Sequence, residues 1–304
     1  MDFRKRKNGP LPILSDSEKG MKVGIVCCSN GKQPEWKEQQ GQLTRVFAQM
    51  GLEPVYSECI FAETSVFGGT ARERAKSLMD FYKDPEIRAI YDISGGDIAN
   101  EVLPYLDFKI IRDSGKRFWG YSDLTTVINA IYTQTGNPSV LYQVRNLIYD
   151  HADEQIRNFK ASVLEGNNDL YDVKYDFIQG EELRGVVVGG NIRCLLKLAG
   201  TKYWPGMEGK ILLLESYGGT VPRMATYLAQ LNQMGVFHQL AGIILGTFTA
   251  MEQQQCRPDI VNLVKTYTGS TLPIVMTREI GHGTDSKAII MGKEVCIHGQ
   301  AGTI

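Results

Sequence analysis

The chain has 304 residues, and its 43% share of hydrophobic residues supplies enough apolar surface for two compact cores. Its 33 Lys and Arg residues balance 34 Asp and Glu residues, so no broad field of one sign exists to hold nucleic acid or an anionic membrane. No segment approaches the roughly 18 to 20 apolar residues that span a bilayer. The basic first twenty residues lack the apolar stretch of about 7 to 15 residues found in secretory signals. We therefore expect a soluble, cytoplasmic protein.

The first half alternates apolar segments of strand length with segments of helical period. Residues 21–28 predict a buried strand, and residues 33–51 place Leu43, Val46, Phe47 and Met50 on one helix face. Similar stripes occur over residues 71–84 and 124–131, and strand-like segments cover residues 87–94 and 116–121. This β-then-α repetition is typical of a parallel sheet flanked by helices, the doubly wound α/β class.

In the second half of the chain, strand-like and helical segments begin again after a polar stretch. Residues 150–184 contain no long apolar segment, so we predict an N-terminal domain over 1–150, a connection over 151–183 and a C-terminal domain over 184–304. Residues 221–235 predict one clear helix. Strands are predicted at 185–190, 210–216, 240–248, 272–280 and 288–299.

The cysteines do not indicate a metal site or a disulfide framework. All six are scattered and none forms a CxxC motif. Cys27 and Cys28 end a strand-like segment, where a free cysteine usually serves as a small buried hydrophobe. We therefore expect reduced core thiols, and no bound metal.

Three polar residues at the ends of apolar segments suggest nucleophilic chemistry. Ser122 follows a strand and a glycine and directly precedes a helix, which is the order found in a nucleophile elbow. A hydroxyl needs a base to accept its proton, and His282, between two glycines after a strand, is the best placed of the four histidines. Glu215, which ends the strand over 210–216, would orient that histidine.

Such chemistry also needs backbone donors for an oxyanion. The amide of Asp123 is one candidate, and Gly96, in the SGGD segment after a strand, is the other. Asn191 opens a helix and is a weaker candidate for binding substrate, because an Asn at that position commonly caps the helix. Structural interpretations stay open too: Ser122 could be a helix N-cap, and Glu215 a solvated strand end.

Several segments together resemble a known family, the LD-carboxypeptidases, whose relatives include the microcin C immunity peptidase. The resemblance spans nearly the whole chain. It is carried by VGIVCCSNG, FGGTARERAKSLMDFYKDPEIRAI, ISGGDIANEVLPYLDF, GYSDLTTVINAIYTQTG, VVGGNIRCLLKLAGTKYWP, KILLLES, AGIILGTF and GHGTDSKAIIMG, in that order.

The resemblance implies that Ser122 is the nucleophile, Glu215 the orienting carboxylate and His282 the general base. It also implies an N-terminal doubly wound parallel-sheet domain, a smaller β-rich C-terminal α/β domain, no cofactor, and a homodimer with its site between the domains. The expected activity is that of a serine carboxypeptidase that releases a terminal D-amino acid from a murein tetrapeptide by cleaving an L,D bond through an acyl-enzyme.

Two departures from the family pattern leave the substrate open. The segment SVLYQVRNLIYD replaces a tyrosine, glycine, proline segment found in many relatives, and Ser216 and Tyr217 follow Glu215 where the muropeptide enzymes carry another acidic residue. The alternative substrate is a peptidyl or aminoacyl nucleotide, for which Tyr203 or Trp204 could stack on a base or, equally, pack in a core. A third interpretation takes ISGGD as a phosphate-binding loop, although no GxxxxGK[ST] motif accompanies it.

Overall fold

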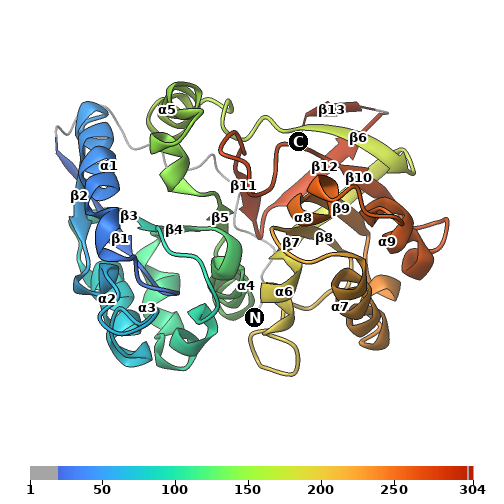
Figure 1. Cartoon of the computed structure of the whole chain (residues 1–304), viewed down its shortest axis with the longest axis horizontal. Helices are drawn as coiled ribbons and strands as arrows, with labels where there is room; N and C mark the ends of the chain where they lie inside the picture. Colours follow the sequence, from blue (N-terminus) through green and yellow to red (C-terminus); the bar gives the residue numbers. More distant parts are fainter. Residues whose placement is uncertain (1–19, 300, 304) are drawn as a thin grey trace.

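The computed structural model describes residues 20–299 and 301–303 and contains two sheets that lie side by side, with α4 at their junction (Figure 1). The first sheet has the strand order β11-β5-β4-β3-β1-β2, in which β1 to β5 run parallel and β11 is antiparallel to β5. Its strands are β1 (Met21–Val26), β2 (Leu52–Tyr56), β3 (Ile87–Asp92), β4 (Arg117–Gly120), β5 (Ser139–Leu141) and β11 (Ile289–Met291).

Helices cover both faces of this sheet, which confirms the doubly wound class. One face packs against α2, α3 and α4, and the other packs against α1 and α5. These helices are α1 (Lys37–Gln49), α2 (Ala71–Lys83), α3 (Phe108–Ser114), α4 (Thr125–Thr135) and α5 (Ala152–Phe159).

The second sheet has the order β12-β7-β8-β9-β10-β6-β13. Its centre, β7 to β10, is parallel, and the outer strands are antiparallel. The strands are β6 (Lys174–Gln179), β7 (Glu182–Asn191), β8 (Lys210–Ser216), β9 (Gly242–Phe248), β10 (Ile274–Met276), β12 (Glu294–His298) and β13 (Ala301–Thr303). The helices here are α6 (Ile192–Leu196), α7 (Val221–Gln233), α8 (Thr249–Gln253) and α9 (Ile260–Thr268).

The two sheets do not divide the chain at the predicted limits. The expected connection, 151–183, contains α5, whose Phe159 lies in the first core, and β6, which pairs with β10 and β13 of the second sheet. In addition, β11 comes from the predicted C-terminal domain but pairs with β5 of the first sheet. Hydropathy finds an apolar strand such as β11 but cannot indicate which sheet it joins. The domain limits therefore remain a prediction from composition.

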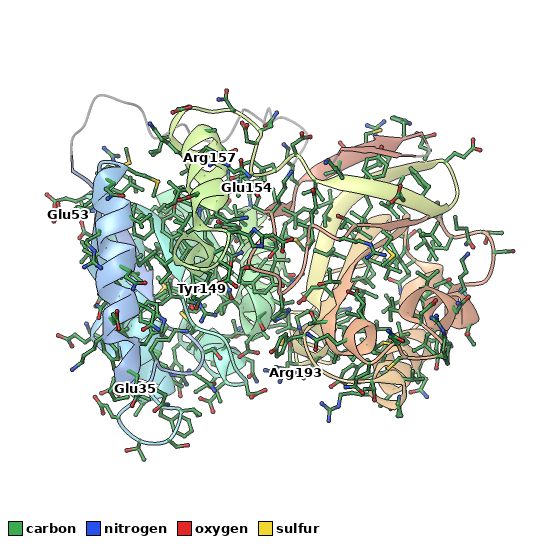
Figure 2. The ribbon with its side chains drawn as sticks, turned by 45° about the horizontal axis from the view of Figure 1, so that its top comes forward. Glu35, Glu53, Tyr149, Glu154, Arg157 and Arg193 are labelled. Carbon is green, nitrogen blue, oxygen red and sulfur yellow. The ribbon has the colours of Figure 1, made fainter. Side chains whose placement is uncertain are left out.

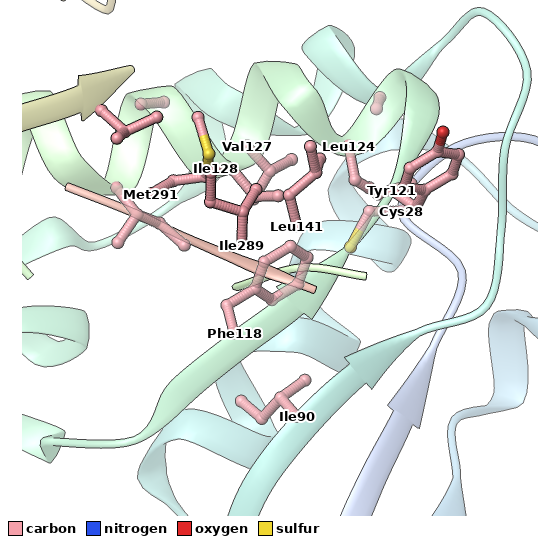
Figure 3. Close-up of a cluster of buried hydrophobic side chains, with 14 of the residues drawn as sticks. Cys28, Ile90, Phe118, Tyr121, Leu124, Val127, Ile128, Leu141, Ile289 and Met291 are labelled. Carbon is pink, nitrogen blue, oxygen red and sulfur yellow. The ribbon is translucent and has the colours of Figure 1, made fainter. Parts of the chain in front are cut away.

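The core beneath α4 shows why β11 crosses to the first sheet. Phe118 of β4, Leu141 of β5 and Ile289 of β11 pack with Val127 of α4 in one buried cluster (Figure 3). A fully buried side chain of this size stabilises the fold by about 1.5 to 3 kcal/mol relative to exposure. The strand thus extends the apolar surface on which α4 lies.

Helix α4 is also bound to the second sheet through polar groups that are buried. The side-chain amide of Asn129 donates to the carbonyl of Gly189 at 2.8 Å and accepts from the Gly189 amide at 2.9 Å. The Thr125 hydroxyl accepts from the Asn191 amide at 3.0 Å. A Cβ at Gly190, where φ is +123°, would lie 2.7 Å from the Thr125 hydroxyl oxygen, so only glycine permits this approach.

Most of the thiols are core residues, as expected. Cys27, Cys28, Cys59 and Cys194 are buried, whereas Cys256 is partly exposed and Cys296 is exposed. Burial raises the pKa of the Cys27 and Cys28 thiols well above the usual range, so neither is a ready nucleophile. Within the described part of the chain, no helix is both long and apolar enough to cross a membrane.

Replacing Asn129 by Ala is expected to lower the free energy of unfolding by about 2 to 4 kcal/mol, because it leaves both the amide and the carbonyl of Gly189 buried and unpaired. Urea titration followed by circular dichroism measures the change. The exposed Asn262→Ala is the matched control and should stay within about 0.5 kcal/mol of the parent. Equal changes in the free energy of unfolding for the two substitutions would show that the contact of Asn129 with β7 does not stabilise the fold.

Candidate active site

The carboxyl ends of strands from both sheets meet at the junction. In the first sheet β4 leads into Ser122, and its neighbours β3 and β5 lead into the SGGD segment and into Tyr142. In the second sheet Glu215 lies near the end of β8, and His282 follows β10. Open parallel sheets bind ligands at this edge, so the junction has the position expected of a ligand crevice.

Ser122 lies in a strained backbone conformation at the start of the helical segment. Its φ is +55°, in the left-handed region that residues other than glycine rarely adopt. A short 3₁₀ turn, Ser122–Leu124, follows and leads directly into α4. Such strain costs on the order of 1 to 3 kcal/mol and persists only where surrounding structure holds it. The sharp turn from strand to helix is the elbow predicted from the sequence.

The three predicted residues lie in one hydrogen-bonded chain. His282 Nε2 lies 3.1 Å from Ser122 Oγ, and His282 Nδ1 lies 2.8 Å from Glu215 Oε2. The Glu215 side chain is fully buried, and that of His282 is 13% exposed. With Nδ1–H donating to the carboxylate, Nε2 is free to accept the serine proton. The arrangement can therefore increase the nucleophilicity of the Ser122 hydroxyl.

Tyr121 is a fourth member of this network that the sequence interpretation missed. Its hydroxyl donates to Glu215 Oε2 at 3.2 Å and lies 3.1 Å from His282 Nδ1. Burial, with the Glu215 carboxylate beside it, raises the pKa of Tyr121 well above the usual value, so the phenol stays neutral and remains a donor. Glu215 Oε2 therefore accepts from two groups, while Glu215 Oε1 has no partner among the described residues.

The loop that carries His282 is fixed by close backbone contacts. The Ser286 hydroxyl donates to the carbonyls of Gly281 and Gly283, at 2.8 and 2.5 Å. A Cβ at Gly281 would lie only 1.7 Å from the Thr247 hydroxyl oxygen, which explains the glycine before the histidine. The imidazole is thus held by the backbone as well as by Glu215.

The two candidate oxyanion donors follow neighbouring strands of the first sheet, Asp123 after β4 and Gly96 after β3. Asp123 is the second residue of the turn after the elbow, where amides of a helical first turn lack intrahelical partners. Its buried carboxylate accepts from Ser29 Oγ at 2.6 Å and forms an ion pair with Lys197. The Gly96 carbonyl accepts from Arg193 Nη2 at 2.9 Å. Both roles remain predictions.

Asn191 caps a helix in the structure. Its side-chain oxygen accepts from the amide of Cys194 at 3.3 Å, and the residue is buried. This is the structural use that the sequence allowed, and contact with substrate stays a prediction.

The SGGD segment is tied down by a buried carboxylate. Ser94 donates to Asp92 Oδ1 through its amide, at 2.7 Å, and through its hydroxyl, at 2.5 Å. Burial raises the pKa of Asp92. Because the Ser94 amide and hydroxyl already donate to this carboxylate, the segment does not favour a bound phosphate.

Aromatic residues near the site differ from those singled out in the sequence. Tyr203 is buried, and Trp204 packs against the hydrophobic clusters. Tyr217, two residues after Glu215, is 62% exposed, and its ring centroid lies 5.0 Å from that of His282. Tyr217 is thus an exposed aromatic surface beside the imidazole, and hydropathy cannot distinguish it from a core residue.

Comparison with known families gives matches to both halves of the chain. Residues 23–142 match the LD-carboxypeptidase N-terminal domain, and residues 184–297 match the LD-carboxypeptidase C-terminal domain.

Individual relatives carry two kinds of name. A probable murein peptide carboxypeptidase of Bacillus subtilis is 25% identical over 92% of this chain and 89% of its own. The microcin C7 self-immunity protein MccF of Escherichia coli is 25% identical over 75% and 76%. A putative carboxypeptidase of Vibrio cholerae is 27% identical over 59% of this chain, which spans only 62% of that relative. A solved structure of MccF in complex with aspartyl sulfamoyl adenosine shares the fold, with a TM-score of 0.82, 20% identity and 97% coverage of both chains.

An organophosphonate probe is expected to label Ser122, and Tyr121→Phe should slow labelling by about 10- to 100-fold because Glu215 loses a donor worth about 1.5 to 3 kcal/mol. Stopped labelling reactions analysed by mass spectrometry give the rate. Tyr132→Phe, on α4, is the matched control and should label at the parent rate. An unchanged labelling rate for Tyr121→Phe would show that the Tyr121 hydroxyl does not affect the reactivity of Ser122.

Proposed function

Because the chain belongs to the LD-carboxypeptidase family of serine peptidases, we propose that it hydrolyses the L,D peptide bond of murein tetrapeptides and releases the terminal D-amino acid. The observation that carries this proposal is the chain of hydrogen bonds from Ser122 through His282 to Glu215. Names of murein peptide carboxypeptidases among the relatives support the substrate class.

In the proposed acylation step, Ser122 Oγ attacks the carbonyl carbon of the L,D bond while His282 Nε2 takes the hydroxyl proton. Glu215 stabilises the imidazolium through Nδ1–H. The tetrahedral oxyanion accepts from the amides of Asp123 and Gly96. When the C–N bond breaks, His282 gives the proton to the leaving amine, and the free D-amino acid departs.

Deacylation reverses these roles. Water enters the site of the departed amine, His282 removes a proton from it, and its oxygen attacks the ester on Ser122. The second tetrahedral intermediate collapses with return of the proton to Ser122 Oγ, which releases the shortened peptide. General base catalysis contributes about 10² to 10⁴ in rate, and each oxyanion donor about 10² to 10³. The residues supply this chemistry without a metal or an organic cofactor.

We further propose that the enzyme is a cytoplasmic homodimer that acts on peptides recovered from murein. The support is the family resemblance, together with a formal net charge of -1, which favours neither nucleic acid nor a membrane as a partner. Analytical ultracentrifugation of the purified protein gives the oligomeric state.

The parent protein is expected to remove one D-alanine from a murein tetrapeptide, and Ser122→Ala is expected to remove none. Mass spectrometry of the peptide before and after incubation measures the loss. Circular dichroism confirms that both proteins are folded. Release of D-alanine at the parent rate by Ser122→Ala would rule out the proposed nucleophile, and no release by the folded parent would rule out this substrate.

A second candidate substrate is an aminoacyl or peptidyl nucleotide, as named in the MccF complexes with sulfamoyl nucleosides. The observation that favours it is the exposed ring of Tyr217 beside His282, because an aromatic face can stack on a nucleobase. The same chemical steps on Ser122 would then break the amide between the aminoacyl group and the sulfamoyl or phosphoryl group.

If a nucleobase stacks on Tyr217, Tyr217→Leu should raise KM for an aminoacyl sulfamoyl adenosine by about 5- to 100-fold, since base stacking is worth about 1 to 3 kcal/mol. Tyr217→Phe keeps the ring and should retain the parent KM. Release of sulfamoyl adenosine, followed by chromatography, gives both constants. Equal KM values for the Leu and Phe variants would remove the support that Tyr217 gives to a nucleotide substrate.

A further inference from the structure

Four cationic side chains lie on the segments directly after β1, β5 and β7, namely the loop 27–33, the turn Val144–Ile148 and α6 with its C-cap residue, and two of them are neutralised. Arg193 pairs with Asp97, and Lys197 pairs with Asp123. The other two, Lys32 and Arg145, have no carboxylate partner among residues 20–299. Tyr149, which contacts Arg145, lies on the N-terminal half, and Arg193 lies near the junction (Figure 2).

Lys32 lies in the loop after β1 and is partly buried. Its ammonium group is 5.6 Å from the centroid of the Trp36 ring. Burial, and then the positive charge of Arg145, lower the pKa of Lys32 to about 8. The positive charge of Arg145 therefore acts against that of Lys32, and the carboxylate of Asp92 acts in the opposite direction.

Arg145 is oriented by neutral groups alone. Its Nη2 donates to Gln143 Oε1 at 2.8 Å, and its Nη1 donates to the Tyr149 hydroxyl at 3.3 Å. Its Nε is buried and has no hydrogen-bond partner among the described residues. A guanidinium with five donors is thus partly unsatisfied, and its planar fork matches the geometry of a carboxylate.

Arg145 lies near segments that carry proposed catalytic groups. A Cβ built on Gly95 would lie 4.0 Å from Arg145 Nη2, and Gly95 directly precedes the proposed oxyanion donor Gly96. The next residue, Asn146, donates to the carbonyl of Gly283, beside His282, at 3.5 Å. The turn that carries Arg145 is therefore near both the SGGD segment and the loop of His282.

A carboxypeptidase must recognise a negative charge one residue beyond the bond it cleaves. Consecutive Cα atoms are about 3.8 Å apart, so the terminal carboxylate lies within one residue length of the attacked carbonyl. We propose that Lys32 and Arg145 bind the terminal carboxylate of the substrate, with Arg145 as the bidentate partner and Lys32 as the second charge. This inference rests on the proposed carboxypeptidase function, and it assigns the group that restricts cleavage to the end of a chain.

The test compares two ligands that differ only in that charge, N-acetyl-D-alanine and N-acetyl-D-alaninamide. Binding to the full-length Ser122→Ala protein, which cannot hydrolyse them, is measured by NMR titration. The acid is expected to bind about 10- to 100-fold more tightly than the amide. Adding Arg145→Gln should raise the Kd of the acid to that of the amide and leave the amide unchanged.

Three controls separate recognition from folding. Lys32→Met should reduce the preference for the acid without altering binding of the amide. Arg145→Lys should restore part of that preference. Arg157→Gln, an exposed arginine of α5, should behave as the parent (Figure 2).

Equal affinity for acid and amide, no measurable binding of either, or a preference retained by folded Arg145→Gln would each overturn the carboxylate site. Binding by Ser122→Ala does not depend on hydrolysis, so this result is independent of D-alanine release by the parent. A parent that releases D-alanine but shows no preference for the acid would refute the carboxylate site alone. A preference for the acid without D-alanine release would refute the murein substrate alone.

Discussion

The site depends on the contact between α4 and β7, because this contact sets the carboxyl ends of the two sheets opposite each other. Ser122 begins the helical segment on one side, Glu215 lies near the end of β8 in the other sheet, and His282 follows β10. Asn129 and Thr125 satisfy backbone groups of β7 that would otherwise be buried and unpaired. Their hydrogen bonds are directional, so they specify one position for the helix, whereas apolar packing alone tolerates several.

The positions of the three residues in the serine, histidine and glutamate chain could be predicted because each follows a strand-like segment in the sequence. His282 also has a glycine on each side, and Gly120 lies two residues before Ser122. The fold class followed from the alternation of strand and helix patterns. What could not be predicted was pairing at a distance: β11 has the hydropathy of any buried strand, and only the structure places it against β5.

Contacts between side chains that are distant in the sequence could not be predicted either. Tyr121 occupies a strand end where an aromatic residue usually packs in the core, and its hydrogen bond to Glu215 arises from two distant segments. Tyr217 and Arg145 lie in segments that depart from the family pattern. The resemblance therefore implies no role for either residue. Their surroundings show what such residues contact: the ring of Tyr217 is exposed beside His282, and the guanidinium of Arg145 has no acidic partner among the described residues.

The crossing of β11 also has a consequence for synthesis on the ribosome. Until residues 289–291 leave the ribosome, β5 has an unpaired edge, and His282 is not yet in place. At about 5 to 20 residues per second, roughly 150 residues after β5 take on the order of 10 to 30 s to emerge. A nascent chain therefore carries an incomplete peptidase, and its site assembles only after residues 289–291 have emerged.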